Sequence, residues 1–304
     1  MKENWTSIDS AEKLKSAIED IRSSPLIGLD TEYDSFRYFR EKLCLIQIST
    51  MSRTYIYDPL GDLEFSFLGD ILRDSATIII MHACGNDVRF IKRDYGFEFH
   101  NIFDTHKAAS LLGSSSLSLP SVIQEYLGLK VEKTKKLQRS RWDIRPLSEE
   151  QLVYAAQDTS CLINLYRIMK ERLEKEGLTE NAKKAFSKLA SSLWIEKTLD
   201  PEGYLKIKGC EVLSESQLKR LKALYLWRFE KAKATNRSRF MILSHRNMLD
   251  LSKENVISIN VMNETGILPQ RSIKEYGAEI VDVLSTSYSE RFLRNKFSCH
   301  FDQG

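Results

Sequence analysis

The stretch from Leu26 to Glu32, with the sequence LIGLDTE, is an apolar run that ends in two carboxylates, Asp30 and Glu32. Such a run predicts a β-strand, in which side chains at positions i and i+2 point to the same face of the sheet. The two carboxylates would then project side by side and repel each other unless a cation lies between them. A divalent ion such as Mg²⁺ or Mn²⁺ prefers oxygen ligands and suits this place. A strand end that frays into solvent is the alternative, so a metal site requires further carboxylates that converge on this pair.

The segments around this strand predict a mixed sheet flanked by helices. Residues 11–21 form an amphipathic pattern capped by Ser10, which indicates a helix before the strand. Two further strand patterns follow at 43–49 and 54–57, and the short connections between the three strands favour an antiparallel meander. From residue 65 onward, helical patterns alternate with a β-branched run at 77–81, which is the rhythm of parallel α/β structure.

Two later segments supply more carboxylates. Asp87 falls in the first turn of a predicted helix, just beyond the carboxyl end of the strand at 77–81, where open α/β sheets build their sites. Tyr154 and Asp158 are four residues apart on a predicted helix that opens with a capping box at Ser148, so they share a face. Taken alone, Asp87 can equally be a helix cap, and the Tyr154 and Asp158 pair can be a surface pair.

Composition favours an intracellular protein of two domains. The 304 residues are 42% apolar, which is ample for at least one core, and no continuous apolar segment is long enough for a membrane span or a signal peptide. The cysteines are odd in number and never paired as C-x-x-C, which disfavours a disulfide framework or a structural zinc site. We therefore expect a cytoplasmic protein with free thiols at five positions: Cys44, Cys84, Cys161, Cys210 and Cys299.

The net charge of +3 conceals an asymmetry between the two halves of the chain. Residues 178–304 carry 21 Lys and Arg against 15 Asp and Glu, whereas residues 1–177 carry 24 against 27. Basic charge gathered in the second half is expected where that half meets a polyanion, although an ordinary solvated helical surface gives the same count.

Taken together, the motifs resemble the ribonuclease D group of the DEDD exonucleases, in the subclass that carries a tyrosine in its last motif. The resemblance rests on several motifs in a fixed order, which is more specific than any one of them. The residues that carry it are Asp30-x-Glu32, Leu43-Cys44-Leu45-Ile46-Gln47-Ile48, Asp87 after His82-Ala83, Trp142-x-x-Arg145-Pro146-Leu147 and Tyr154-x-x-x-Asp158.

This resemblance implies a ribonuclease H-like α/β exonuclease domain over residues 1–177, followed by a smaller all-α domain. In the second half, apolar residues recur at helical spacing from Leu213 to Phe229, and Trp227-Arg228-Phe229-Glu230 and Tyr276-Gly277 are similar to the HRDC module of this family. We expect a helical connector at 178–208, an HRDC-like nucleic-acid-binding domain at 209–290 and a tail at 291–304. Bacterial members usually carry two such modules, and the residues after Lys206 leave room for one.

The resemblance also implies a reaction. Asp30, Glu32, Asp87 and Asp158 would hold two divalent ions, Mg²⁺ or Mn²⁺, about 3.5–4 Å apart, with Asp30 bridging both. Tyr154 would orient the attacking water, because a phenol with a pKa of about 10 is a poor free base near neutrality. The implied activity is stepwise hydrolysis from the 3′ end, which releases nucleoside 5′-monophosphates. The implied partners are RNA 3′ ends, typically of transfer RNA precursors. We expect no membrane partner, and a monomer is favoured although the sequence does not determine the oligomeric state.

A basic stretch in the second half is the predicted nucleic-acid contact. Between residues 219 and 246 there are nine basic residues against the single acid Glu230, and such a patch would neutralise phosphates with little sequence preference. Some of these side chains are expected to be plain surface. The nine are Lys219, Arg220, Lys222, Arg228, Lys231, Lys233, Arg237, Arg239 and Arg246.

Two other functions remain open from the sequence. A DNA 3′ to 5′ exonuclease uses the same carboxylate set, and side chains that read the 2′-hydroxyl cannot be picked out of a sequence. An RNA-binding scaffold without catalysis would be marked by a missing carboxylate, and none is missing.

Overall fold

The computed structural model describes residues 4–131, 135–254 and 258–286. It divides into two compact units. Unit 1 contains the chain up to Asp34 and from Glu41 to Ile195, and unit 2 contains Ser35–Arg40 and the chain from Glu196 onward. The expected tail at 291–304 and Cys299 lie outside the described residues. The other four cysteines are free, as predicted, and all four are buried.

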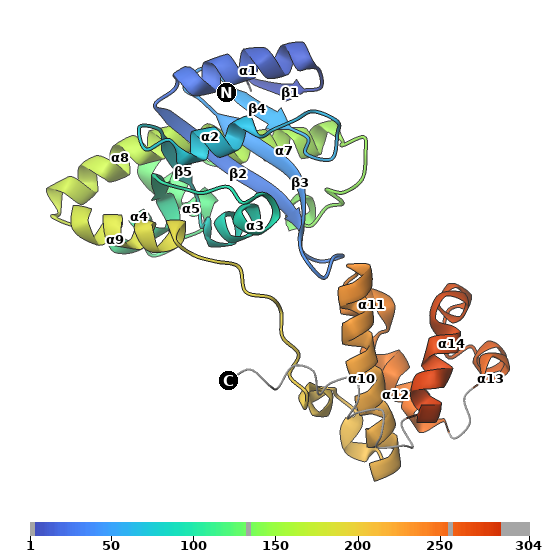
Figure 1. The fold of residues 1–304 in the computed structure, drawn as a ribbon. Helices are drawn as coiled ribbons and strands as arrows, with labels where there is room; N and C mark the ends of the chain where they lie inside the picture. The colour runs from blue at the N-terminus through green and yellow to red at the C-terminus, as the bar shows by residue number, and fades with distance from the viewer. Residues whose placement is uncertain (1–3, 132–134, 255–257, 287–304) are drawn as a thin grey trace. The chain divides into compact units, whose positions relative to one another are not determined.

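Unit 1 is a mixed sheet with helices on both faces (Figure 1). Its strands are β1 (Trp5–Ile8), β2 (Leu26–Asp34), β3 (Lys42–Ser49), β4 (Thr54–Tyr57), β5 (Ile78–Met81) and β6 (Ile102–Asp104). Its helices are α1 (Ala11–Ser23), α2 (Phe67–Arg73), α3 (Gly85–Tyr95), α4 (Thr105–Leu111), α5 (Leu119–Leu127), α6 (Lys135–Gln138), α7 (Glu149–Ser160), α8 (Leu162–Lys175) and α9 (Thr179–Ala190).

The strand order is β1-β4-β3-β2-β5-β6, with β2 in the interior of the sheet. β2 pairs antiparallel with β3, and β3 with β4, which confirms the predicted meander. β5 lies parallel to β2. Sequence reasoning missed β1 and β6, which are four and three residues long and pair in parallel with β4 and β5. β6 has only three residues, which is too short to show an alternation of apolar and polar side chains.

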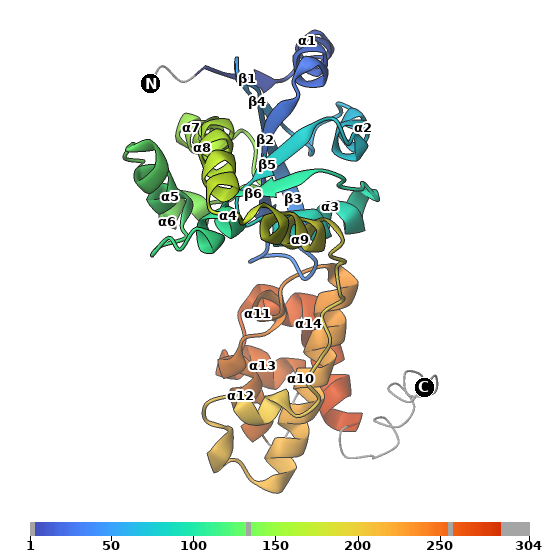
Figure 2. The same cartoon turned by 90° about the vertical axis from the view of Figure 1, so that its left-hand side faces the viewer.

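The two faces of the sheet are covered by different helices. In Figure 2, α1, α2 and α3 lie on one side of the sheet and α5, α7 and α8 on the other. Ile27 and Leu29 of β2 pack into the core on the side of α1, α2 and α3. Because side chains alternate along a strand, Gly28, Asp30 and Glu32 face α7 and α8. Because Ile27 and Leu29 face α1, α2 and α3, the two carboxylates of β2 point toward the layer of α7 and α8.

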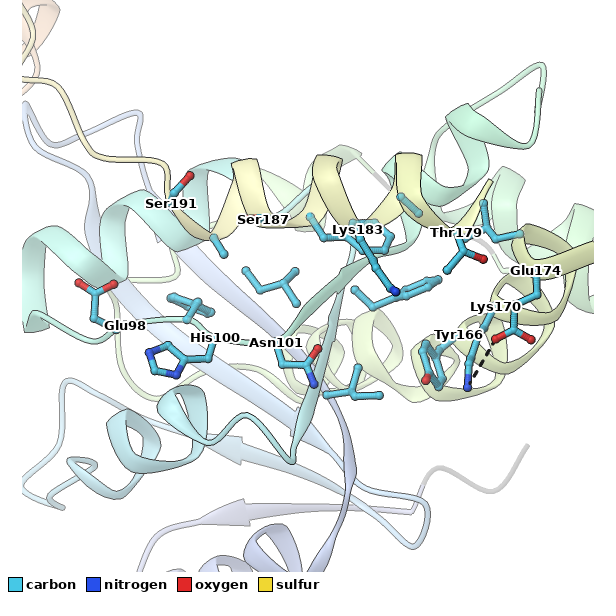
Figure 3. Close-up of a pocket in the computed structure, with 18 of the residues that line it drawn as sticks. Glu98, His100, Asn101, Tyr166, Lys170, Glu174, Thr179, Lys183, Ser187 and Ser191 are labelled. Atoms are coloured by element: carbon cyan, nitrogen blue, oxygen red, sulfur yellow. Dashed lines mark ion pairs between the residues drawn. The ribbon is translucent and has the colours of Figure 1, made fainter. Parts of the chain in front are cut away.

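α9 lies in the segment expected to connect the two domains, and it packs on unit 1. It buries Ala182 and Phe186, whose ring lies 4.8 Å from that of Phe103 on β6. A cavity of about 730 Å³ opens between β6, α8 and α9. Figure 3 shows its polar rim, where the ammonium of Lys170 lies 3.8 Å from the carboxylate of Glu174. None of the predicted site residues lines this cavity.

Unit 2 is helical. Its elements are η1 (Gly203–Lys206), η2 (Cys210–Val212), α10 (Glu215–Thr235), α11 (Arg239–Ile242), α12 (His245–Lys253), α13 (Ile259–Thr265) and α14 (Gln270–Thr286). α10 opens with a capping box at Ser214 and supplies Leu221, Leu224 and Phe229 to the core. The β2–β3 connection, Ser35–Arg40, belongs to this unit because Phe39 is buried in the same core. In the described ranges, no helix is both long and apolar enough to cross a membrane.

Candidate active site

The five residues predicted for the site line one pocket of unit 1, with a volume of about 780 Å³. They come from three elements that are far apart in the sequence, namely β2, α3 and α7. The full lining is Asp30, Thr31, Glu32, His82, Ala83, Asp87, His106, Leu117, Ser118, Leu119, Pro120, Gln138, Tyr154, Asp158 and Leu162. The frayed-strand alternative for Asp30 and Glu32 is therefore wrong, because both lie inside a paired strand and face this pocket.

β2 sets the positions of the first two carboxylates. Asp30 lies opposite Gln47, and Glu32 lies opposite Leu45, in the antiparallel pairing with β3. The register shifts between Glu32 and Tyr33, immediately after the second carboxylate. Such an irregularity bends a strand and re-aims its side chains, and it is common beside active sites.

The carboxyl end of α7 lies unusually close to β2 at Gly28. A Cβ atom placed on Gly28 would lie 2.4 Å from Ser49 Oγ and 3.1 Å from the carbonyl oxygen of Thr159. Ser49 Oγ donates a hydrogen bond of 2.9 Å to that same carbonyl. Thr159 follows Asp158 in α7, so the absence of a side chain at Gly28 lets Asp158 approach the strand that carries Asp30.

The segment before α7 is anchored to the sheet by Arg145. Its guanidinium donates to the carbonyl oxygen of Cys44 at 2.7 Å, to that of Trp142 at 2.7 Å and to both oxygens of Asp58. Burial would raise the pKa of Asp58, but the hydrogen bonds from Arg145 and from the Leu60 N–H outweigh it and hold the pKa below its usual range. Arg145 therefore fixes the entry to α7.

Asp87 is placed by the turn between β5 and α3. Ala83 adopts a left-handed conformation with φ of 56°, and the next N–H, that of Cys84, donates to buried Asp104 at 2.8 Å. This bond holds a turn that otherwise costs about 1–2 kcal/mol for a residue other than glycine. The helix that starts here brings Asp87 to the pocket, where Thr31 Oγ1 of β2 donates to its carboxylate.

The pKa of Asp87 reflects its surroundings. Burial is the largest influence and raises the pKa to about 6, the hydrogen bond from Thr31 opposes this, and the charge of Asp104 adds to it. A carboxylate that is costly to ionise in this position gains from a cation beside it. The N-cap position of α3 is Cys84 and not Asp87, and Asp87 lines the pocket, so the structure favours the site over the capping alternative.

Tyr154 lies in α7 one turn before Asp158, and it is only 6% exposed. Its ring packs 6.0 Å from that of Trp142. Burial raises the pKa of the Tyr154 phenol well above its ordinary value, and the charges of Asp158, Glu32 and Asp30 raise it further. The negative charges of the three carboxylates thus act on the hydroxyl group, which stays protonated at neutral pH. The alternative that Tyr154 and Asp158 form an exposed pair on a helix surface is therefore wrong, because both are buried.

Two histidines of the pocket were not predicted as site residues. His82 follows β5, and its Nδ1 shares a hydrogen bond of 2.9 Å with Thr105 Oγ1, which in turn donates to the Met81 carbonyl oxygen. The ring of His106 lies 5.6 Å from that of His82. His82 stands next to a recognised motif, but no spacing in the sequence connects it with His106.

The nine basic residues of unit 2 do not form one solvated patch. Arg220 and Arg228 are buried and donate to the carbonyl oxygens of Glu254 and Leu243. Six others pair with carboxylates from outside the stretch: Lys219 with Glu215, Lys222 with Glu202, Lys231 with Glu279, Lys233 with Glu196, Arg237 with Glu275 and Arg246 with Asp250. A count over residues 219–246 left these partners out, because two of them lie four residues beyond its ends and the other four approach only in the folded chain. Among the described residues, only Arg239 of the nine lacks a recorded bond to an acid or a carbonyl.

Comparison with known families gives two matches. The 3′-5′ exonuclease family matches residues 5–174, and the HRDC domain matches residues 217–284. The first match covers more than half of the chain and contains every predicted carboxylate. The second covers most of the described part of unit 2.

Individual relatives agree with these families. The chain is 32% identical over 254 residues to the exosome complex component 10 homolog of Drosophila melanogaster, covering 81% of this chain and 28% of that protein. It is 27% identical over 247 residues to ribonuclease D of Gluconacetobacter diazotrophicus, covering 81% and 62%. Its fold matches the catalytic core of RRP6 from Trypanosoma brucei with a TM-score of 0.84 at 23% identity, covering 94% and 80%. The chain thus spans less than two thirds of the length of these two sequence relatives.

Proposed function

Because the chain belongs to the 3′-5′ exonuclease family, in its ribonuclease D and RRP6 branch with an HRDC domain, we propose that it is a metal-dependent 3′ to 5′ exoribonuclease. It hydrolyses RNA from the 3′ end and releases nucleoside 5′-monophosphates. The observation that carries this proposal is the convergence of Asp30, Glu32, Asp87, Asp158 and Tyr154 on one pocket.

The donor set of this pocket fits hard divalent cations. Four carboxylates offer only oxygen ligands, which suit Mg²⁺ and Mn²⁺. In the described ranges, no three acidic, histidine or cysteine side chains form a ready-made metal cage. Mg²⁺ is usually bound through one or two carboxylates together with water and substrate phosphates, so an open carboxylate set suits this ion better than a closed cage. Asp30, Glu32, Asp87 and Asp158 are the residues that would hold it.

Tyr154, Thr31 and Ser49 have separate roles beside the carboxylates that would hold the metal ions. When bound, the ions would lower the pKa of the attacking water and stabilise the leaving 3′ oxygen. The protonated Tyr154 hydroxyl orients that water by hydrogen bonding rather than by accepting its proton. Thr31 holds the Asp87 carboxylate in one orientation, and Ser49 holds the end of α7 that carries Asp158.

The substrate is RNA with an accessible 3′ end, and precursors of transfer RNA are the first class to test. Support for RNA comes from the similarity to a protein named ribonuclease D, since a ribonuclease acts on RNA. The HRDC match adds a domain of a kind associated with nucleic-acid binding.

A single incubation tests reaction, polarity and metal requirement together. We expect 3′-labelled RNA to release a labelled mononucleotide at once, and 5′-labelled RNA to shorten as a ladder, with Mg²⁺ or Mn²⁺ but not with a chelator. Internal fragments as first products, or equal rates with the chelator, would contradict the proposal. A matched DNA strand in parallel distinguishes an exoribonuclease from a DNA exonuclease.

Gly28→Ala tests whether the close approach of α7 to β2 positions the site. The added methyl group would displace Ser49 Oγ, which bonds the Thr159 carbonyl, and it would also press on that carbonyl oxygen of α7 at 3.1 Å. We expect the rate of RNA hydrolysis to fall about 10- to 100-fold, because a displacement of about 1 Å at a site can cost that much. The free energy of unfolding should fall by about 1–3 kcal/mol.

Gly61→Ala is the matched control for this variant, because a Cβ there meets only the Asp58 carbonyl oxygen at an ordinary 3.5 Å. Rates are measured at saturating RNA and stability by denaturant unfolding. A Gly28→Ala enzyme with the wild-type rate would show that α7 tolerates a shift and that its contact with β2 does not set the site.

A further inference from the structure

A second pocket with an unbalanced positive charge lies within unit 2. It has a volume of about 700 Å³ and is lined by the loop Ser35–Arg40 and residues 197–207, together with α10, α11 and the start of α12. We call it the Arg228 cavity, and its polar and aromatic lining includes Phe36, Arg228, Ser238, Arg239, Phe240 and His245. It shares no lining residue with the pocket that holds the candidate catalytic carboxylates.

Arg228 is the central cation of this cavity. Only 2% of the residue is exposed, and one terminal nitrogen donates to the Leu243 carbonyl oxygen at 3.0 Å. Its Nε is buried and has no hydrogen-bond partner among the described residues. A buried guanidinium with an unused donor is costly unless an acceptor reaches it. The buried Ser238 Oγ, also on the cavity wall, likewise has no partner in the described part of the chain.

Arg239 is the cation that acts on Arg228, whose guanidinium also lies 5.6 Å from the centre of the Tyr225 ring. Burial, and then the charge of Arg239, lower the pKa of Arg228 to about 10. Burial, and then the charges of Arg228 and Arg239, lower the pKa of His245. The acid that lines the cavity, Asp200, already pairs with Lys206 at 2.7 Å. Within the described residues neither Arg228 nor Arg239 pairs with an acidic side chain, so the two cations repel each other and an anion would relieve that repulsion.

Exposed aromatic rings stand beside these cations. Phe36 is 65% exposed and Phe240 49% exposed, and their ring centroids are 4.7 Å apart. Large apolar side chains that stay exposed next to positive charge suit a ligand with both a phosphate and a planar base. Loop Ser35–Arg40 is held to unit 2 by the hydrogen bond of 2.8 Å from the Ser238 N–H to the Arg37 carbonyl oxygen. The rings and the cations thus belong to one built surface.

We propose that the Arg228 cavity binds a phosphate of single-stranded RNA through Arg228, Arg239 and His245, with a neighbouring base stacked on Phe240 and Phe36. This inference rests on the proposed function and adds an RNA subsite within unit 2. The aromatic pair selects single strands, since the bases of a duplex are already stacked on each other. Phe36 is four residues after Glu32 in the sequence, so RNA in this cavity contacts the connection that leaves the catalytic strand.

The phosphate contact is tested by removing Arg239, whose exposed side chain is not needed for folding. Binding of a labelled single-stranded oligoadenylate to the full chain is measured in chelator, so that no hydrolysis occurs, over a range of salt concentrations. Arg239→Ala should weaken binding about three- to tenfold and reduce the salt slope by about 0.7, the value for one lost phosphate contact on a single strand.

Arg246→Ala is the matched control, because it removes the same charge from the adjacent helix and does not line the cavity. Equal losses of affinity for Arg239→Ala and Arg246→Ala would overturn the proposal in favour of a diffuse basic surface. Failure of the wild-type chain to bind the oligoadenylate measurably would also overturn it. Hydrolysis by the wild-type chain in Mg²⁺ tests the proposed function separately, so the failure of one is distinguishable from the failure of the other.

The stacking contact is tested with Phe240→Ala against Met241→Ala, which removes a neighbouring exposed apolar side chain outside the cavity. Phe240→Ala should weaken single-strand binding at least about fivefold and leave the salt slope unchanged. Met241→Ala should bind as the wild type does. Competition by duplex RNA equal to that by a single strand, or equal effects of the two variants, would overturn the stacking assignment.

Discussion

Asp30→Asn is expected to lower the rate of RNA hydrolysis by at least about 10³-fold, because a metal site supplies several kcal/mol of transition-state stabilisation. Asparagine keeps the size and shape of the side chain and removes its negative charge. Asp30 lies in the paired part of β2 and faces the pocket, so the strand itself should not change. Binding of RNA in chelator should stay within about threefold of wild type. Single-turnover hydrolysis and equilibrium binding measure the two quantities.

Asp70→Asn provides the control for this variant. Asp70 is an exposed carboxylate on α2, in the layer that covers the opposite face of the sheet, and it pairs only loosely with Arg22 at 3.3 Å. The same chemical change there should leave both rate and binding unaltered. If Asp30→Asn keeps a tenth or more of the wild-type rate, Asp30 does not hold a metal ion that the reaction needs.

The sequence predicted the part of the site that depends on local periodicity. The i, i+2 spacing of Asp30 and Glu32 needs only that the segment be a strand, and the i, i+4 spacing of Tyr154 and Asp158 needs only a helix. The capping box predicted at Ser148 is present in the structure. Bringing β2, α3 and α7 together required the family resemblance, since no local pattern determines which helix covers which face.

Long-range contacts were the part that the sequence did not disclose. The hydrogen bond from Thr31 to Asp87 joins residues that are 56 positions apart, and Arg145 reaches Asp58 across 87 positions. The stretch around residues 219–246 appeared strongly basic because acids such as Glu202 and Glu279 approach only in the folded chain. Arg228 and Arg239 can be distinguished from the other basic residues of this stretch only in the folded chain, where six of the others are seen to pair with acids.

The division of the chain into two units illustrates a similar point. Sequence reasoning expected the exonuclease domain to be continuous, yet the loop Ser35–Arg40 within it contributes Phe39 to the core of unit 2. The ring of Phe39 lies 5.2 Å from that of Phe229 in a T-shaped arrangement. The residues around Phe39 do not indicate that its ring packs against Phe229, because the two residues are about 190 positions apart in the sequence.

Tyr154→Phe is expected to slow hydrolysis about 10²-fold, less than Asp30→Asn, because it removes one hydrogen bond to the attacking water and leaves the carboxylates in place. Phenylalanine preserves the packing against Trp142. The phenol of Tyr154 has a pKa raised far above neutrality by burial and by three carboxylates, so it stays protonated over the range in which RNA is stable. It positions the water and does not accept its proton.

The dependence of the rate on pH separates these two roles. Removal of a positioning residue that does not titrate should lower the rate by the same factor at every pH. The pH profile of Tyr154→Phe should therefore keep the wild-type shape. A general base would leave its ionisation step in the wild-type profile, and the variant would lose that step. Tyr126→Phe, which removes a hydroxyl bonded to Ser114 at 2.9 Å outside the pocket, should change neither rate nor shape. A flattened profile in Tyr154→Phe would contradict the positioning role and would require a phenolate that burial among carboxylates strongly disfavours.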